Sequence, residues 1–147
     1  MAKQIRFKKL EAQAVIPQFQ TKGAAGFDFH ALEDAVLKPG EVTLVRTGLS
    51  VEIPEGFELQ VRARSGLSAK AGVFLVNGIG TIDCDYRGEI KVIMSTCLSK
   101  TVEIKAGDRI AQGVIAAVFQ PEIVEVSQLT ETERGAGGFG STGVSRS

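Results

Sequence analysis

The segment "FELQVRAR", residues 57–64, alternates apolar and polar side chains along its whole length. Phe57, Leu59 and Val61 begin the apolar set, and each is followed by a charged or amide side chain. Successive side chains of a strand point to opposite faces of its sheet. This period of two therefore predicts a strand that buries one face and exposes the other to water.

The same period recurs in other parts of the chain. In the segment "EIKVIMST" (89–96), Ile90, Val92 and Met94 share one face, and "EVTLVRTGLSVEI" (41–53) and "TVEI" (101–104) behave similarly. The segment "GVIAAVF" (113–119) is apolar on both faces, which predicts a strand buried on both sides. Short strands of this kind, separated by glycine and proline turns, indicate an all-β sandwich or barrel.

The length and the tail indicate a simple organisation. A chain of 147 residues favours one domain, and only "SGLSAKAG" (65–72) suits a short helix. Few large side chains follow Arg134, so we expect residues 1–133 to form the domain and residues 134–147 to form a flexible, glycine-rich arm. Residues 135–140 match G-x-G-x-x-G, but no strand precedes them and no helix-forming segment follows, so they do not indicate a dinucleotide site.

The composition excludes several classes of protein. Lysine plus arginine and aspartate plus glutamate number 17 each, so no net field attracts nucleic acid or an acidic membrane, and we expect neither partner. Cys84 and Cys97 do not make a disulfide framework, and with a single histidine they do not supply a four-ligand zinc site. Because no apolar segment is long enough to span a bilayer, we expect a cytoplasmic protein, or a nuclear one if the source is eukaryotic or viral.

Five segments combine glycine with ionisable side chains and are the candidates for chemistry. They are "AAGFDFHA" (24–31), "VRARSGLSAK" (61–70), "VNGIGTIDCDYRGE" (76–89), "GDRIAQG" (107–113) and "RGAGGFGSTG" (134–143). In the second segment, Arg64, Ser65 and Gly66 open the expected helix, and a helix N-terminus with an arginine and a hydroxyl suits a phosphate. Ser65 could instead cap the helix beside a solvated arginine.

The other segments also allow more than one interpretation. Asp83 and Asp85 lie on the same side of an ideal strand, and they could hold a metal, orient a water or belong to an acidic hairpin with Tyr86 in the core. Gln112 lies in an apolar segment, so its amide requires a hydrogen-bond partner if it is buried. We interpret His30 as structural, and the tail glycines either let the backbone approach an anion or form a disordered end.

In content and order, the five segments resemble the motifs of the dUTPase (deoxyuridine 5'-triphosphate nucleotidohydrolase) family, of the homotrimeric all-β kind. The match runs from Ala25 to Gly143, and "NGIGTIDCDYRGE" and "RGAGGFGSTG" are its most specific parts. Three positions depart from the family pattern: Ala63 stands in place of proline, Phe29 in place of leucine and Gly113 in place of a bulky apolar residue. None of these changes removes a group that would take part in chemistry.

The resemblance implies a distorted jelly-roll, a barrel-like sandwich with one short helix, whose glycine-rich arm closes over the active site. It also implies hydrolysis of dUTP to dUMP and pyrophosphate with Mg²⁺ on the triphosphate, which removes dUTP and supplies dUMP for thymidylate synthesis. Since each site in this family draws its motifs from three subunits, we expect a homotrimer with shared active sites.

The resemblance also assigns roles to individual side chains. Asp83 would hold and activate the water that attacks the α-phosphorus, and Asp28 would act in the shell of water around the metal. Asp85 aligns with a variable position of the family and is left out of the catalytic set. The residues that would bind the phosphates are Arg64, Ser65, Gly66, Gln112, Arg134, Gly138, Ser141 and Thr142.

A separate set would bind the base and the sugar. Asn77 and the backbone from Gly78 to Ile82 would read uracil, because a backbone N–H and C=O pair matches its O4 and N3–H. Tyr86 would pack where a ribose 2′-OH would lie, and Phe139 of the arm would stack on the uracil.

Two other functions stay open at this point. A dCTP deaminase of the same superfamily would need a catalytic glutamate near the base pocket, and such enzymes lack the complete arm motif found here. In a nucleotide-binding regulatory protein with a protein partner, hydrolysis would be lost or incidental, and the presence of Asp83, Tyr86 and Arg134 argues against its loss. A regulatory role alongside catalysis is compatible with every motif.

Overall fold

The computed structural model describes residues 4–141 and 143. Over these residues the chain forms eleven strands and one helix, which confirms the all-β expectation. In chain order they are β1 (Arg6–Lys9), β2 (Phe27–His30), β3 (Ala35–Leu37), β4 (Thr43–Arg46), β5 (Leu49–Glu52), β6 (Phe57–Arg62), α1 (Ser65–Ala71), β7 (Val73–Leu75), β8 (Gly80–Ile82), β9 (Lys91–Thr96), β10 (Val102–Ile104) and β11 (Arg109–Ala117).

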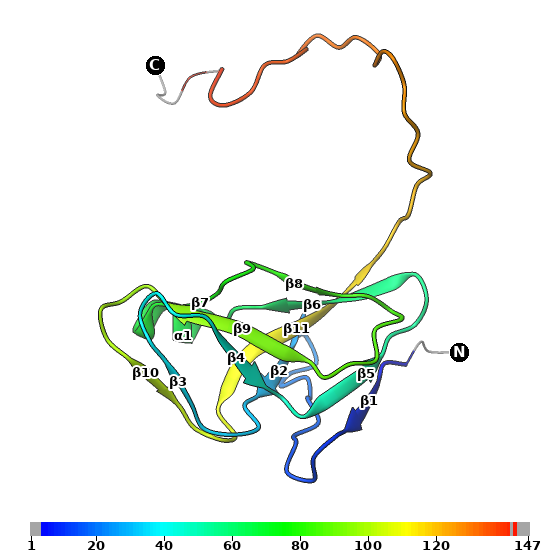
Figure 1. The fold of residues 1–147 in the computed structure, drawn as a ribbon. Helices are drawn as coiled ribbons and strands as arrows, with labels where there is room; N and C mark the ends of the chain where they lie inside the picture. The colour runs from blue at the N-terminus through cyan, green and yellow to red at the C-terminus, as the bar shows by residue number, and fades with distance from the viewer. Residues whose placement is uncertain (1–3, 142, 144–147) are drawn as a thin grey trace.

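The strands form four small sheets, and the strand pairs within them are antiparallel. A four-stranded sheet has the order β2-β11-β6-β8 and a three-stranded sheet the order β4-β9-β7, while β1 pairs with β5 and β3 with β10. Figure 1 shows these sheets gathered into one body, with β8 along its upper edge. Buried side chains of both larger sheets join one apolar cluster, so the sheets pack as the layers of a sandwich.

Strand β6 behaves as its alternation predicts. Leu59 and Val61 are 0% and 4% exposed, whereas the residues between and after them keep contact with solvent. The apolar face of the segment 89–96 is buried in the same way, because Val92 and Met94 of β9 are 1% and 0% exposed. Burying each of these side chains contributes about 1.5–3 kcal/mol to the stability of the fold.

The segment 41–53 forms two strands, β4 and β5, where its pattern indicated continuous alternation. Gly48 lies between them with a φ of +68°, and a Cβ at this position would lie 2.7 Å from Cδ1 of Leu32. A left-handed backbone and so close an approach both require glycine. The chain therefore turns a corner here and passes from the β4-β9-β7 sheet to the β1-β5 pair.

The prediction that residues 113–119 are buried on both faces is wrong for the end of β11. Ile110 and Ala111 near the start of this strand are 1% and 0% exposed, but Val118 and Phe119, just beyond its end, are 38% and 87% exposed. The pattern marks apolar side chains correctly. Within the described part of the chain, however, no second layer covers this end of the strand.

The short helix and the cysteines agree with expectation. Helix α1 ends at Gly72, whose φ of 61° places it in the left-handed conformation usual for a helix C-terminus. Cys84 and Cys97 are free thiols. Within residues 4–141 and 143, no helix has the length and apolar character that a membrane crossing requires.

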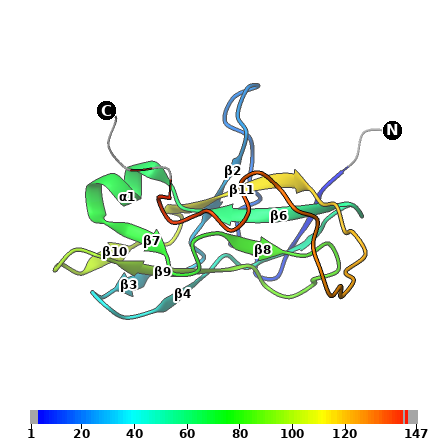
Figure 2. The same cartoon turned by 90° about the horizontal axis from the view of Figure 1, so that it is seen from above.

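The chain leaves the packed body after Val118, whose N–H donates to the carbonyl of Gly56 at 2.9 Å. From Phe119 onward the described residues are almost all exposed. Residues 119–133 therefore lie outside the packed body, although we expected them to be part of the domain. Figure 1 shows this segment and the arm rising away from the sheets, and Figure 2 shows the arm passing over β6 and β8 in projection only.

Two of the three departures from the family pattern meet at one place in the core. Gly113 of β11 pairs with Phe27 of β2, and a Cβ on Gly113 would lie 2.5 Å from Cε2 of Phe27 and 2.9 Å from Cε2 of Phe29. Phe29 is fully buried. The rings of Phe27 and Phe29 therefore occupy the space that a side chain at position 113 would need, and we expect the large Phe29 and the missing side chain at Gly113 to compensate each other in part.

We expect Gly113→Leu to lower the free energy of unfolding by about 1–3 kcal/mol, because overpacking would displace the Phe27 and Phe29 rings. Chemical denaturation measures this loss. In a double-mutant cycle, Phe29→Leu should destabilise the Gly113→Ala protein less than it destabilises the native protein, because the smaller side chain makes room for the new methyl group. Strictly additive effects would disprove the compensation.

Candidate functional site

A pocket of about 390 Å³ opens beside β8 and the turn that follows it. Six of the residues that the motifs assign line this pocket, namely Asn77, Gly80, Thr81, Ile82, Asp83 and Tyr86. The other lining side chains are mostly aliphatic and come from β4, β6, β7, β9 and the segment that leads into β9. A concave, largely apolar lining with a few polar groups is typical of a site for a small organic molecule.

The segment that carries Asp83 is a tight turn, because β8 ends at Ile82. The N–H of Tyr86 donates to the carbonyl of Asp83 at 3.2 Å, and Nη1 of Arg87 donates to the carbonyls of Cys84 at 2.7 Å and Tyr86 at 3.0 Å. The strand alternation that was to align the two aspartates therefore stops before Asp83. Tyr86 is 45% exposed, so the interpretation that placed it in the core is wrong.

Strand β8 presents free backbone groups to this pocket. It is the last strand of its sheet, and within the described residues it pairs with β6 alone. Its outer backbone N–H and C=O groups are thus available to a ligand, as on any unpaired edge. Gly78 lies in the turn before β8 with a φ of +71°, and its N–H donates to the carbonyl of Leu75 at 2.9 Å rather than lining the pocket.

A second group of motif residues gathers around Asp28 on β2. Its Oδ1 accepts a hydrogen bond from Nε of Arg64 at 3.1 Å, and its Oδ2 accepts one from Nη1 of Arg109 at 3.4 Å. Gln112 of β11 pairs in register with Asp28, and its amide donates to the carbonyl of Ala63 at 2.9 Å. The partner that Gln112 required is therefore present, and the cluster has two arginines for one carboxylate.

Helix α1 begins directly after Arg64, which is its N-cap residue and makes no side-chain cap hydrogen bond. The interpretation of Ser65 as the N-cap is therefore wrong. Ser65 and Gly66 are exposed in the first turn, which contains no acidic side chain, and a Cβ on Gly66 would meet nothing within 4 Å. This first turn of the helix is therefore open to solvent at Gly66.

Within one chain the two groups lie at opposite ends of β6. Ile82 pairs with Leu59 near the start of β6, so Asp83 follows at that end, whereas Arg64 follows the last residue of the strand. At about 3.3 Å per residue, the separation along the strand is roughly 15–20 Å. The fold brings Asp83 together with Asn77 and Tyr86, and it does not bring Asp83 together with Arg64.

Among the described residues of the arm, no hydrogen bond or ion pair reaches either group. Nε of Arg134 donates to the carbonyl of Gly137 at 2.8 Å, and the N–H of Ser141 donates to the carbonyl of Gly138 at 3.0 Å, so these hydrogen bonds stay within the arm. The ring of Phe139 is fully exposed. Thr142, which the motif also assigns to the phosphates, lies outside the described residues.

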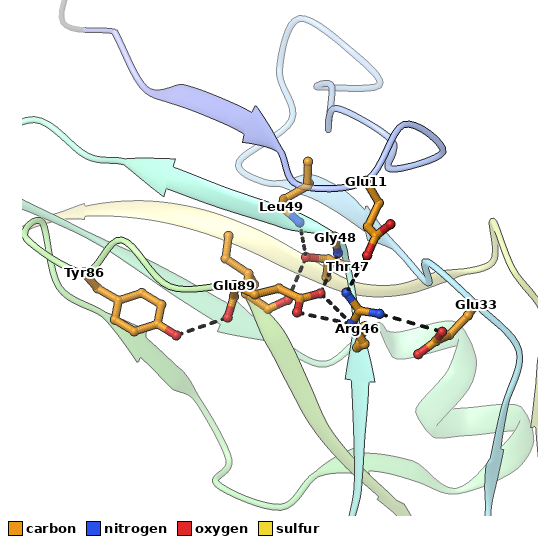
Figure 3. A network of polar contacts seen from close by, with 9 residues as sticks. Glu11, Glu33, Arg46, Thr47, Gly48, Leu49, Tyr86 and Glu89 are labelled. Carbon is orange, nitrogen blue, oxygen red and sulfur yellow. Dashed lines mark hydrogen bonds and ion pairs between the residues drawn. The ribbon is translucent and has the colours of Figure 1, made fainter.

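Sequence reasoning missed an ion pair beside the pocket (Figure 3). Nε of Arg46 donates to both carboxylate oxygens of Glu89, at 3.0 and 3.2 Å, and its Nη2 donates to Glu11 at 3.1 Å. Glu89 lines the pocket, and its side chain is only 14% exposed. The available signal was Arg46 itself, which continues the positions of Val42 and Leu44 in the alternation with a charged side chain.

The comparison with known proteins agrees with the motifs. The family model described as dUTPase matches residues 12–143. The deoxyuridine 5'-triphosphate nucleotidohydrolase of Nautilia profundicola is 57% identical over 139 residues, which cover 95% of this chain and 98% of that protein.

Solved structures show the same relationship at lower identity. The dUTPase of Staphylococcus bacteriophage 80alpha, solved with dUPNHPP and described as controlling the transfer of virulence genes, aligns with a TM-score of 0.88 at 29% identity, over 96% of this chain and 99% of that chain. A variant dUTPase of phage phi11 of S. aureus, reported with a structural Mg(II) ion, aligns with a TM-score of 0.79 at 26% identity, over 85% of this chain and 97% of that chain.

We expect the free energy of unfolding to fall as the pH drops below about 6.5, because burial lowers the pKa of His30 and its Nδ1 has no hydrogen-bond partner within the described residues. Asp28 opposes this shift, whereas Arg109 and Arg64 add to it. As the pH falls, His30 therefore binds a proton more readily in the unfolded chain than in the folded chain. The stability that is present near neutral pH is then lost on acidification. Denaturation at about pH 7.5 and about pH 5.5 measures the change, and His30→Gln should flatten it. An identical slope in the variant would rule out His30 as its source.

Proposed function

The chain belongs to the dUTPase family, and we propose that it hydrolyses dUTP to dUMP and pyrophosphate, with the Asp83 carboxylate activating the attacking water. The observation that carries the proposal is the pocket beside β8. It brings the candidate base-reading, sugar-contacting and water-activating groups to one place, namely Asn77, Tyr86 and Asp83. The reaction would remove dUTP and supply dUMP for thymidylate synthesis.

The free edge of β8 supports selection for uracil. An outward N–H and C=O pair on this strand matches the O4 and N3–H of uracil, and cytosine presents the reverse order of acceptor and donor. A cytosine in the pocket would leave buried polar groups without partners, which costs about 1–3 kcal/mol for each group. With uracil bound in this way, contact with the aliphatic side chains of the lining would exclude the 5-methyl group of thymine.

The turn after β8 supports the role of Asp83. Its carboxylate follows the base-reading strand directly, so it would lie near the α-phosphate of a nucleotide whose base occupies the pocket. The water oxygen forms a bond to the α-phosphorus, Asp83 takes the water proton, and the bond from the α-phosphorus to the bridging oxygen breaks to release pyrophosphate. A carboxylate suits this task because it both aligns the water and accepts its proton.

The cluster on β2 and β11 supports phosphate binding. Asp28 orients the guanidinium of Arg64, and the carbonyl of Ala63 orients the amide of Gln112, so both donors are arranged before the substrate arrives. Preorganised donors that meet developing charge supply most of the catalysis in phosphoryl transfer. Ser65 and Gly66, in the exposed first turn of α1, would complete this phosphate seat.

The donor set fits Mg²⁺ held mainly by the substrate. Among the described residues, no three His, Cys, Asp or Glu side chains gather as a metal cage. Mg²⁺ prefers oxygen ligands and keeps several waters, so the triphosphate would bind it directly and Asp28 would hold it through water. In that position the ion would neutralise phosphate charge.

We also propose a homotrimer with shared active sites. Adjacent phosphates of one triphosphate are only a few ångströms apart, whereas Asp83 and Arg64 of one chain lie at opposite ends of β6. One substrate can meet both only if the Arg64 cluster comes from a neighbouring chain. The exposed Phe139 and the arm glycines, which contact nothing in their own body, are free to close over a site on another subunit.

Replacing Asp83 with Asn should lower kcat for dUTP by roughly 10²–10⁴-fold, because the amide no longer accepts the water proton, while KM stays nearly unchanged. Pyrophosphate release in the presence of Mg²⁺ measures both constants. Asp85→Asn, in the same turn, is the matched control and should keep native turnover. Native turnover in Asp83→Asn would refute its role, and ammonia release from dCTP by the native enzyme would indicate a deaminase.

Mixing Asp83→Asn chains with Arg64→Gln chains should restore turnover, although each variant alone is nearly inactive. In a mixed trimer some sites combine a native Asp83 from one chain with a native Arg64 from another. Two affinity tags on the two variants allow mixed assemblies to be isolated and assayed. Arg64→Gln mixed with Gln112→Ala should recover nothing, because both changes lie in one cluster. Isolated mixed assemblies without turnover would overturn the shared site.

A further inference from the structure

The ring of Tyr86 is held in place by few contacts. At 45% exposure it is not fixed by burial, and its hydroxyl donates one hydrogen bond, to the backbone carbonyl of Glu89 at 3.1 Å. The ring also lies directly against Gly88. A Cβ on Gly88 would overlap the Tyr86 hydroxyl and would lie 2.5 Å from Cζ and 2.9 Å from Cε2. The position of the ring thus depends on the absence of a side chain at residue 88 and on the position of one carbonyl.

That carbonyl belongs to a residue with several partners of its own (Figure 3). The Glu89 carboxylate pairs with Nε of Arg46, and its Oε1 also accepts the N–H of Gly48 at 3.0 Å. With 14% of its side chain exposed, this ion pair is shielded from solvent more than a surface pair is. A charge-assisted pair in such a setting keeps its geometry better than a neutral one.

The backbone after Glu89 is fixed to the same corner of the fold. The N–H of Ile90 donates to the carbonyl of Leu49 at 2.8 Å, and the carbonyl of Ile90 accepts the hydroxyl of Thr47 at 2.7 Å. Ile90 is 2% exposed, so its side chain anchors the segment in the core. Residues 88–90 therefore form a rigid support that leads from the β4–β5 corner to the hydroxyl of Tyr86.

We propose that Gly88, Glu89 and Arg46 are positioning residues that hold the Tyr86 ring at the sugar end of the pocket and thereby set the preference for deoxyribose over ribose. The proposal rests on the proposed function, because it takes the pocket to bind a nucleoside triphosphate. None of the three residues is assigned to base, sugar or phosphate by the motifs. They act on the substrate only through the ring.

The physical effect is one of excluded space. A ring held close to C2′ leaves room for hydrogen and not for a hydroxyl group, so a small displacement of the ring would admit a ribonucleotide. Asp83 precedes Tyr86 in the same turn, but it meets dUTP and UTP at the same α-phosphorus. A disturbance of Asp83 would therefore lower turnover of both substrates together, whereas displacement of the ring would change their ratio.

Gly88→Ala tests the proposal, since the added methyl group meets the movable end of the Tyr86 side chain rather than backbone. Gly23→Ala is the matched control, because a Cβ there would meet nothing within 4 Å. Tyr86 is the only tyrosine and the chain has no tryptophan, so intrinsic tyrosine fluorescence reports on this ring alone. We expect Gly88→Ala to change the quenching of this fluorescence by iodide and Gly23→Ala to leave it unchanged, with no substrate present.

Steady-state assays of the full-length trimer with dUTP and with UTP supply the second readout. Gly88→Ala should lower the preference for dUTP, measured as kcat/KM for dUTP divided by kcat/KM for UTP, by roughly tenfold. This is the usual effect of a misfit of one small group. Glu89→Gln, which removes the charge and keeps an oxygen that can accept the Gly48 N–H, should lower this preference by a smaller factor. This second variant keeps the proposal testable if Gly88→Ala folds poorly.

The outcomes separate the two proposals. A lower preference for dUTP over UTP, together with altered iodide quenching of the Tyr86 fluorescence, supports the positioning role. An unchanged ratio in both variants overturns it, even if turnover of both substrates falls, and leaves the proposed function standing. A native enzyme that does not hydrolyse dUTP refutes the proposed function, whereas unchanged quenching in Gly88→Ala refutes the placement of the ring.

Discussion

The hydrogen-bonded register of β6 with β8 and β11 determines where each candidate site residue lies. β8 carries the candidate base-reading backbone and ends at Ile82, just before Asp83 and beside the start of β6. Arg64 lies two residues beyond the end of β6, near Gln112 of β11. A paired strand cannot shorten, so these two ends stay apart in every conformation that keeps the sheet. If both groups act on one substrate, as we propose, the site would form between chains and its chemistry would depend on oligomerisation.

Ion pairs fix polar side chains both near the pocket beside β8 and in the cluster around Asp28. Asp28 orients Arg64 on one side, and Arg46 orients Glu89 on the other. Each pair is partly shielded from solvent, where an ion pair is stronger and its geometry better defined than on the surface. Both pairs connect strands from different parts of the sequence, so the sheets align the donors and acceptors before a ligand binds. Such preorganisation avoids the cost of ordering the groups during the reaction.

Periodicity predicted the strands most reliably where one face of a sheet is buried. The alternation of β6 and the apolar face of β9 both appear in the structure as the pattern indicates. Prediction failed where contacts distant in sequence decide the outcome. Gly48 turns the chain at a corner that alternation does not reveal, and the apolar end of β11 lacks a covering layer in one chain. The turn at Asp83 likewise interrupts an apparently regular strand.

The sequence by itself determined the all-β class and the five motifs, because side-chain type and period are local properties, and the resemblance of these motifs to a known family pointed to a nucleotide. Only the tertiary structure decided that Asp83 and Arg64 stand at opposite ends of one strand and that Glu89 pairs with Arg46. It also decided that the rings of Phe27 and Phe29 fill the space beside Gly113. These relations depend on strand order and register, which are set by packing between segments far apart in the chain.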